Sequence, residues 1–266
     1  MTALSRDPLL GDLLALAAQA GALIMDHYAA GLRGRTKADD SPVTDADEDA
    51  ERLILAGLER LAPGIPVVSE EAAAAGRWPK IADRFFLVDP LDGTKEFLAR
   101  NGEFTVNIAL IVDGRPATGV VYAPAFARLF GADAAGAVEL HWPPAETAVA
   151  LPSLSAAQPI RARQEAAHPI ALWSRTHDLH RADEYRELYR VSAARVLGSS
   201  LKFCLLAAGE ADLYPRHGPT MEWDTAAGQA VLEAAGGSVR DLQGRPLGYG
   251  KTGDGFRNPS FVARGR

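Results

Sequence analysis

Apolar residues recur with helical spacing in the first part of the chain. Leu and Ala residues between 8 and 30 predict a long helix, which Gly31 and Gly34 bring to an end. Thr44 can cap a second helix, and Pro63-Gly64 stops it. The apolar positions of this second helix fall on one face: Leu53, Ile54, Leu58 and Leu61.

Short apolar runs predict the strands that follow. They occur at 65–69, 85–88, 104–112 and 117–122. The Asp113-Gly114 pair predicts a hairpin between the last two of these strands. From about 131 to 165 the chain is rich in Ala and Pro and weakly patterned, which indicates edge strands and a crossover.

Strands and helices alternate in the second half. We expect strands at 170–173, 195–197 and 211–214, and helices at 178–190, 200–209 and 225–235. Asp224 precedes the last helix, and Gly236-Gly237 closes it. The pattern therefore predicts an α/β protein, with an α+β half over 1–150 and an α/β half over 151–266 packed into one compact unit.

Composition narrows the class of protein. With 266 residues the chain can bury a full core, and its net charge of −6 argues against a surface that coats nucleic acid. Cys204 is the only cysteine, so disulfides within the chain are excluded and a reducing compartment is expected. The Leu- and Ala-rich segment 9–25 is interrupted by Asp12, which favours an amphipathic surface helix over a membrane span. We therefore expect a cytoplasmic protein without a transmembrane segment.

The stretch DPLDGTKEF at 89–97 carries the clearest chemical signal. It follows the apolar run 85–88, so Asp89 and Asp92 are expected at a strand exit, separated by a Pro-Leu turn. Carboxylates there can hold hard cations such as Mg²⁺. Gly93 and Thr94 are expected to open a short helix, whose free N–H groups can hold a phosphate.

Further acids stand at the ends of predicted elements. Asp47 lies in the first turn of a helix, Glu70 follows a strand, and Asp224 precedes a helix. If Glu70, Asp224 and the 89–92 pair converge, they supply oxygens for two cations about 4 Å apart. Each acid also has an ordinary interpretation: Asp47 as a complement to the helix dipole, Asp224 as an N-cap, and Glu70 as part of a solvated loop.

Cationic residues in the second half indicate a second anionic group on the ligand. In GSSLK at 198–202, Ser199 and Lys202 lie near a predicted helix start. Arg216 follows a predicted strand and can form a forked contact with a phosphate. An ordinary surface Lys and Arg are the alternative interpretation of these two residues.

Several separated motifs, in order, resemble those of the metal-dependent inositol monophosphatase superfamily. They are SPVTDAD (41–47), VVSEE (67–71), DPLDGTKEF (89–97) and WDTAAGQAVLEAAGG (223–237). The segments NGEFTVNIAL (101–110), GVVYAP (119–124), GSSLKFC (198–204) and LYPRHGPT (213–220) resemble its bacterial 3′(2′),5′-bisphosphate nucleotidase branch, the CysQ type. The resemblance spans residues 8 to 262 and is weakest over 131–165.

The resemblance implies a role for each matching position. Glu70, Asp89 and the Leu91 carbonyl would bind a first magnesium, and Asp89, Asp92 and Asp224 a second; a third ion is usual. Thr94 would orient the attacking water, with Asp47 or Glu70 helping to activate it. The N–H groups of Gly93 and Thr94 would grip the scissile phosphate. The implied substrate contacts are Glu70, Leu91, Asp92, Gly93, Thr94, Ser199, Lys202, Arg216 and Asp224.

The resemblance also implies a fold and a reaction. The fold would be a layered αβαβα sandwich, and the reaction the Mg²⁺-dependent release of the 3′-phosphate of adenosine 3′,5′-bisphosphate to give AMP, by water and without a covalent intermediate. 3′-Phosphoadenylyl sulfate would be a second substrate, and Ser174 to His177 would border the nucleotide. The protein would be a monomer or homodimer, cytoplasmic or peripheral on the inner face of the membrane.

Three alternatives remain open at this point. Within the same fold, the substrate could be an inositol monophosphate or a sugar bisphosphate. An aspartyl-phosphate phosphatase uses DxDGT, and this chain has one residue more between Asp89 and Asp92. The last alternative is a non-catalytic metal-binding interaction protein.

Overall fold

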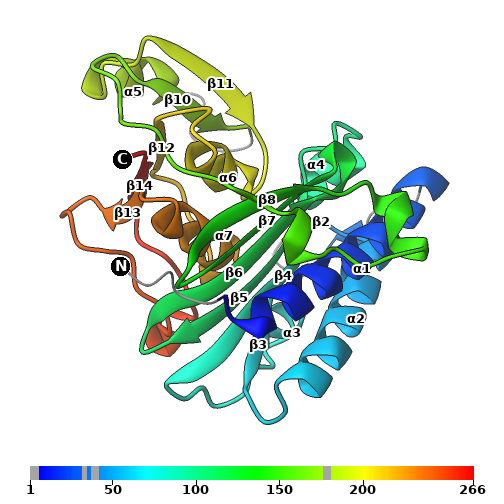
Figure 1. Cartoon of the computed structure of the whole chain (residues 1–266). Helices are drawn as coiled ribbons and strands as arrows, with labels where there is room; N and C mark the ends of the chain where they lie inside the picture. Colours follow the sequence, from blue (N-terminus) through cyan, green and yellow to red (C-terminus); the bar gives the residue numbers. More distant parts are fainter. Residues whose placement is uncertain (1–5, 32–34, 37–41, 176–180) are drawn as a thin grey trace.

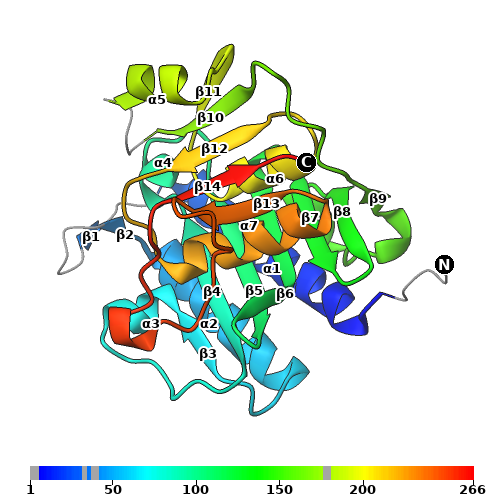
Figure 2. The ribbon, with the colours of Figure 1, turned by 90° about the vertical axis from the view of Figure 1, so that its left-hand side faces the viewer.

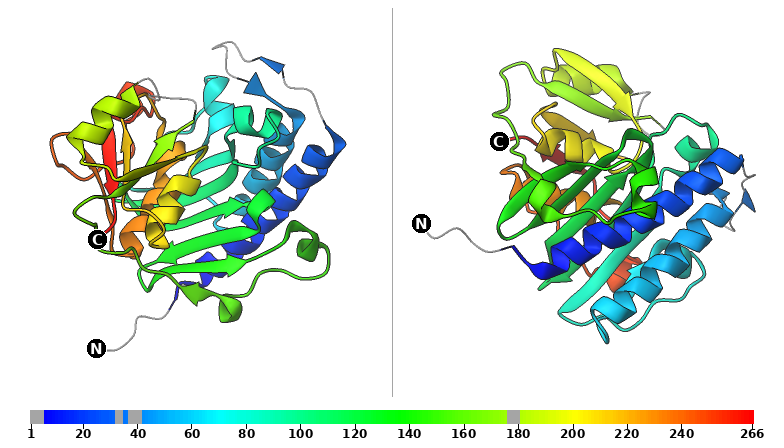
Figure 3. Two further views of the ribbon diagram at one scale, coloured as in Figure 1. Left: turned by 90° about the horizontal axis from the view of Figure 1, so that it is seen from above. Right: turned by 45° about the vertical axis from the view of Figure 1, so that its right-hand side comes forward.

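The computed structural model describes residues 6–31, 35–36, 42–175 and 181–266, arranged in five layers (Figure 1). The helices are α1 (Pro8–Ala30), α2 (Asp45–Leu61), α3 (Glu70–Ala74), α4 (Thr94–Leu98), α5 (Ala182–Leu188), α6 (Leu201–Ala207) and α7 (Glu222–Ala234). Helices α1 and α2 cover one face of a large sheet, and α6 and α7 cover the other. Figure 3 shows this sandwich from above. A second sheet packs on α6 and α7, and α5 forms the outermost layer.

Seven strands form the large sheet, in the order β3-β4-β5-β6-β7-β8-β9. Their bounds are β3 Val67–Ser69, β4 Arg84–Asp92, β5 Thr105–Val112, β6 Arg115–Ala123, β7 Arg128–Asp133, β8 Gly136–His141 and β9 Gln158–Pro159. The β3–β4 pair is parallel, and every later pair in this sheet is antiparallel. The predicted Asp113-Gly114 hairpin joins β5 to β6.

The second sheet has the order β11-β10-β12-β14-β13. Its strands are β10 Ile170–Ser174, β11 Ala193–Leu197, β12 Leu213–Arg216, β13 Ser238–Asp241 and β14 Phe261–Arg264. Strand β10 pairs in parallel with β11 and β12, whereas β14 is antiparallel to β12 and β13. A two-stranded ribbon, β1 (Arg35–Thr36) with β2 (Pro42–Val43), precedes α2.

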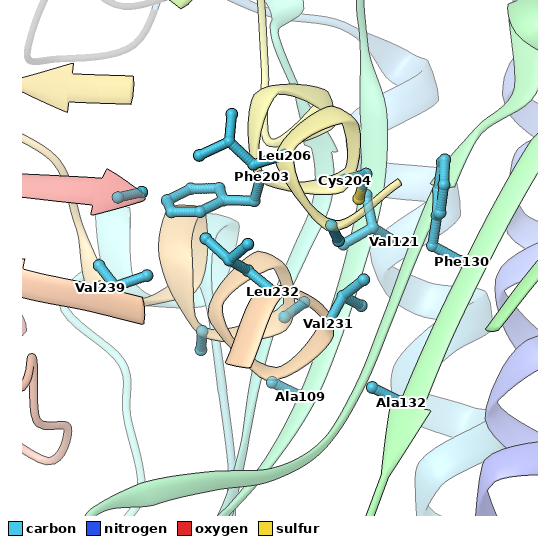
Figure 4. Close-up of a cluster of buried hydrophobic side chains, with 14 of the residues drawn as sticks. Ala109, Val121, Phe130, Ala132, Phe203, Cys204, Leu206, Val231, Leu232 and Val239 are labelled. Carbon is cyan, nitrogen blue, oxygen red and sulfur yellow. The ribbon is translucent and has the colours of Figure 1, made fainter. Parts of the chain in front are cut away.

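Burial on both faces explains why the strands of the large sheet read as continuous apolar runs. In β4, Phe86 and Val88 pack toward α1 and α2, while Phe85 and Leu87 pack toward α6 and α7. Figure 4 shows the second of these interfaces, where Val121 and Phe130 face side chains of α6 and α7. The part of β4 that directly precedes Asp89 is therefore buried between the two helix layers.

Most predicted elements are confirmed, and the layered αβαβα fold with them. The prediction of a Pro-Leu turn between Asp89 and Asp92 was wrong, because β4 continues to Asp92. Asp224 does not precede its helix but lies in the first turn of α7. Strands β13 and β14 were not predicted. The predicted helix at 178–190 is observed as Ala182–Leu188, and residues 178–180 lie outside the described part of the chain.

The division into halves at residue 150 stays a prediction. The large sheet continues to Pro159, and α6 and α7 from the second half pack on it. Cys204 is buried in that packing, and burial raises the pKa of its thiol.

Helix α1 is long and apolar enough, by length and composition alone, to cross a membrane. Half of the 18-residue stretch of α1 that passes this test is buried within the protein, against α2 and the large sheet. Leu10, Leu13 and Leu14 are fully covered there. These contacts explain its hydrophobicity as that of a core helix.

Gly119 marks the closest approach between β6 and α7. A Cβ at this position would lie 2.6 Å from the Ala230 Cβ and 2.8 Å from the Ala227 carbonyl oxygen. We expect Gly119→Ala to lower the free energy of unfolding by about 1–3 kcal/mol through overpacking. Urea denaturation measures the change. Gly253→Ala is the matched control, because no atom lies within 4 Å of the Cβ it would add; equal effects of the two variants would contradict the prediction.

Candidate active site

A cavity of about 420 Å³ opens where β4 ends. The starts of α3, α4, α6 and α7 border it, as does the segment 255–257, which lies beside α3 in Figure 2. Of the metal-ligand, catalytic and phosphate-binding residues proposed from the sequence, all but Asp47 line this cavity: Glu70, Asp89, Leu91, Asp92, Gly93, Thr94, Ser199, Lys202, Arg216 and Asp224. The fold therefore brings together side chains from both halves of the chain.

A bulge in β4 places Asp89 and Asp92 in the same cavity. Asp89 pairs with Asn107 of β5, and Asp92 pairs with Thr105, so β4 holds one more residue than its partner. In a regular strand, side chains three positions apart point to opposite faces. The extra residue restores the same face for both carboxylates, and Pro90 is tolerated there because a bulge interrupts the hydrogen-bond ladder.

Gly93 connects this strand to α4 through a left-handed backbone. Its φ is 96°, and a Cβ there would lie 2.9 Å from the Glu103 carbonyl oxygen. Both facts require glycine. The turn places Thr94 at the first position of the helix, beside the end of β4.

Asp47 lies behind the cavity and contacts Thr94. Its Oδ2 accepts hydrogen bonds from the Thr44 N–H at 2.7 Å and the Thr44 hydroxyl at 2.6 Å. Its Oδ1 accepts from the Thr94 hydroxyl at 3.0 Å, and the Leu91 carbonyl lies 3.3 Å from the same hydroxyl. Asp47 is 1% exposed. It therefore lies in the first turn of α2, as expected, where it completes the capping box with Thr44, and it also holds the Thr94 side chain.

Burial and neighbouring carboxylates raise the pKa of two acids of the cavity, Asp89 and Asp224. Burial raises the pKa of Asp89 well above its ordinary value, and repulsion from Glu70, Asp92 and Asp224 adds to it. The pKa of Asp224 is raised by burial and then by Asp92 and Glu70. Four acids at one buried site are unfavourable unless cations offset their charge. Their oxygen donors are also those that hard divalent cations prefer, so the residues fit such ions.

The carboxylates border the cavity without closing into a cage. Among the described residues, no group of three or more His, Cys, Asp or Glu side chains is arranged to hold a metal ion as it stands.

Lys202 and Arg216 are both buried at the cavity wall, not surface residues. The Lys202 ammonium donates to the carbonyls of Leu197 at 3.3 Å and Ser199 at 2.5 Å. Burial lowers the pKa of Lys202 to about 8, although Asp92 opposes the shift. Arg216 donates to the Ser174 hydroxyl at 2.9 Å and the Pro219 carbonyl at 2.7 Å.

The Arg216 Nε is buried, and no described residue accepts a hydrogen bond from it. Arg216 therefore keeps an unsatisfied donor in the wall of the cavity. Of the predicted 174–177 border, Ser174 lines the cavity, while Arg175 turns to Glu103, with nitrogen–oxygen distances of 2.7 and 2.8 Å. Thr176 and His177 lie outside the described residues.

Sequence reasoning missed two parts of the site. Ser200, in the same GSSLK motif, hydrogen-bonds Asp92 and the Asp224 carbonyl. The exposed Trp78 packs edge-on against Phe256, and both line the cavity. No sequence signal distinguished Ser200 from Ser199, whereas the Trp78–Phe256 contact joins segments that only the fold brings together.

A buried carboxylate secures the Phe256 segment. Glu222, fully buried in the first turn of α7, accepts hydrogen bonds from the N–H groups of Gly250 at 2.7 Å and Lys251 at 2.9 Å. The Lys251 ammonium lies 2.7 Å from the same carboxylate. Helix α7 thus positions both Asp224 and one wall of the cavity.

The sequence model of the inositol monophosphatase family matches residues 6–260. The chain belongs to the inositol monophosphatase family. It is 46% identical over 248 residues to the 3′(2′),5′-bisphosphate nucleotidase CysQ of Salmonella typhimurium, covering 92% of this chain and 95% of that protein. It is 44% identical to CysQ of Escherichia coli K12, covering 95% and 98%.

A solved structure agrees with this assignment. CysQ from Bacteroides thetaiotaomicron superposes with a TM-score of 0.76 at 36% identity, covering 96% of each chain. These comparisons indicate a hydrolase of the phosphatase class. Phosphatases of the inositol monophosphatase family generally depend on metal ions.

The carboxylate cluster predicts how the stability of the protein depends on pH when no metal is present. A raised pKa means that the folded chain keeps a proton that the unfolded chain has released, so stability falls as pH rises above about 4 toward the raised pKa. Asp89→Asn removes this loss. We expect its unfolding midpoint at pH 8 in EDTA to lie about 2–4 °C above that of the unsubstituted chain. Differential scanning calorimetry measures it.

Asp83→Asn, at the exposed residue directly before β4, is the control and should leave the midpoint unchanged. A midpoint for Asp89→Asn at or below that of the unsubstituted chain at pH 8 would contradict the repulsion.

Proposed function

We propose that this protein hydrolyses the 3′-phosphate of adenosine 3′,5′-bisphosphate to AMP and phosphate. The observation that carries the proposal is one cavity with two kinds of groups that can serve a phosphate. Carboxylates suited to binding metal cations line one part of it, and the buried cationic side chains of Lys202 and Arg216 line another. A substrate with one phosphate would use only the first kind. The names of the relatives support the same substrate.

Magnesium is the proposed metal, as two or three ions. The residues that would hold it are Glu70, Asp89, the carbonyl of Leu91, Asp92 and Asp224. When bound, it would supply positive charge that offsets the phosphoryl oxygens and favours ionisation of water.

The Asp47–Thr94 pair is proposed to prepare the attacking water. Because the Thr94 hydroxyl donates to Asp47, its lone pairs remain available to accept a hydrogen bond from water. Asp47 is buried and accepts two further hydrogen bonds from Thr44, so it can fix the direction of the Thr94 proton. Glu70, at the cavity, would share in activating the water. Phosphoryl transfer needs this positioning more than a covalent nucleophile.

The N–H groups of Gly93 and Thr94 are proposed to grip the scissile phosphate. The second phosphate would contact Ser199, Lys202 and Arg216, whose buried Nε lacks a partner among the described residues. Aromatic rings of Tyr214 and Trp223 also line the cavity, which suits a flat base better than an inositol ring.

3′-Phosphoadenylyl sulfate carries the same 3′-phosphate and a charged 5′ group, so we propose it as a second substrate. This would place the enzyme in sulfur metabolism. We propose a cytoplasmic location, where both nucleotides would be reached.

A phosphate-release assay across a substrate panel tests the function. With Mg²⁺ present, the nucleotide bisphosphate should exceed inositol monophosphate and fructose 1,6-bisphosphate in kcat/KM. Arg216→Ala should raise KM for the nucleotide bisphosphate about 10-fold or more, because it removes a charge-assisted contact, and should change KM for inositol monophosphate less than twofold. Arg195→Ala, an exposed arginine of the same sheet, is the control. Equal effects on both substrates would overturn the assignment.

Lys202 gives the enzyme an expected pH dependence. With its pKa near 8, the ammonium loses its charge as pH rises through 8, so its attraction for a phosphate is lost in that range. We expect KM for the nucleotide bisphosphate to rise between pH 7 and 9. Lys202→Met should show a high KM that no longer changes over this range. A KM of the unsubstituted enzyme that stays constant up to pH 9 would contradict the role of Lys202.

A further inference from the structure

We propose that Ser200 is a positioning residue that fixes Asp92 and Asp224 relative to each other for cation binding. This inference rests on the proposed function, since it concerns the same carboxylates. Ser200 was not among the residues expected from the sequence or from the family resemblance. Its hydroxyl joins β4, α6 and α7, three elements that carry the site.

The contacts of Ser200 are short and buried. Its N–H and its hydroxyl both donate to Oδ2 of Asp92, at 2.6 and 2.8 Å. The hydroxyl also lies 2.5 Å from the Asp224 carbonyl oxygen, so its one proton is shared between two acceptors. The Asn107 side-chain amide donates to the hydroxyl oxygen at 3.0 Å. Ser200 is 2% exposed, so water does not compete for these bonds.

These contacts leave the two carboxylate oxygens of Asp92 in different environments. Oδ2 accepts from Ser200 twice and from Asn107 at 3.5 Å, whereas no described residue donates to Oδ1. A carboxylate fixed through one oxygen keeps its other oxygen available in a defined direction. Residues that orient a metal ligand in this way affect metal affinity strongly, although they do not touch the ion.

The ordinary role for a serine at this position is absent. Ser200 is the N-cap of α6, yet its side chain makes no capping hydrogen bond. The Leu201 N–H instead lies 3.4 Å from the Ser199 hydroxyl. The Ser200 hydroxyl is therefore used entirely on the carboxylate site.

A second anchor holds the same loop from the other side. The Gly198 N–H donates to Glu103 at 2.8 Å, and Glu103 is held by Arg175. Ser199, between the two anchors, has a φ of 50°, a left-handed backbone that is unfavourable for a residue with a Cβ. Such a conformation persists only where its neighbours fix it. The loop is thus held at one end by Asp92 of β4 and at the other by Glu103, which lies just before β5.

Titration calorimetry with Mg²⁺ alone, on the full chain, tests the proposal without substrate. Ser200→Ala should weaken Mg²⁺ binding by about 10-fold or more, the usual cost of losing such an orienting contact. Ser200→Cys keeps the volume with a weak donor and should weaken it in the same direction, and Ser200→Thr should recover most of the affinity. Ser192→Ala, which removes an exposed hydroxyl bonded to backbone carbonyls, is the matched control.

Kinetics supply a second readout. In Ser200→Ala the Mg²⁺ concentration for half-maximal rate should rise about 10-fold, while KM for the substrate at saturating Mg²⁺ stays within twofold. Folded Ser200→Ala and Ser200→Cys proteins that bind Mg²⁺ like the unsubstituted chain would overturn the inference. Should Ser200→Ala not fold, Ser200→Cys decides by the same criterion.

Failure of the proposed function looks different. In that case the unsubstituted enzyme would not act on the nucleotide bisphosphate, but the calorimetric order of the Ser200 variants would still hold. If the unsubstituted enzyme hydrolyses the nucleotide and the variants bind Mg²⁺ equally well, only the role of Ser200 is wrong.

Discussion

Repulsion among carboxylates in one cavity is the constraint that the surrounding structure has to satisfy. Asp89 and Asp224 come from different layers, and burial strengthens the unfavourable interaction between them. Neither β4 nor α7 alone has a reason to hold its acid near the other. Apolar packing of α6 and α7 on the large sheet supplies the favourable free energy that keeps them together. Local hydrogen bonds then set the direction of each carboxylate.

The bulge in β4 shows how sequence spacing and strand geometry are reconciled. Asp89 and Asp92 are three positions apart, which a regular strand would send to opposite sides of the sheet. A Pro-Leu turn between the two acids, as the sequence indicated, would have been one solution. The chain adopts another, in which one extra residue shifts the register and the strand continues. The convergence of the two acids was thus predictable, but not the backbone that produces it.

Long periodic segments could be read from the sequence because their apolar stripes extend over many turns, as in α1 and α2. The acids of the cavity were visible because they cluster at element ends. Ser200 was not, since two adjacent serines look alike until the left-handed backbone at Ser199 sends their side chains to different partners. Glu222 was hidden for a similar reason, because an acid in the first turn of a helix needs no buried partner to explain it.

The order of the strands in the second sheet has a consequence for how the protein is made. Strand β14 follows all the others along the chain, yet it lies between β12 and β13. While a ribosome is still synthesising that segment, β12 and β13 have no shared neighbour, and the sheet remains split. Apolar side chains such as Phe203 and Tyr214, which pack on Phe261 of β14, stay uncovered during this interval. Until β14 is made, these side chains therefore add to the apolar surface through which the nascent chain can aggregate.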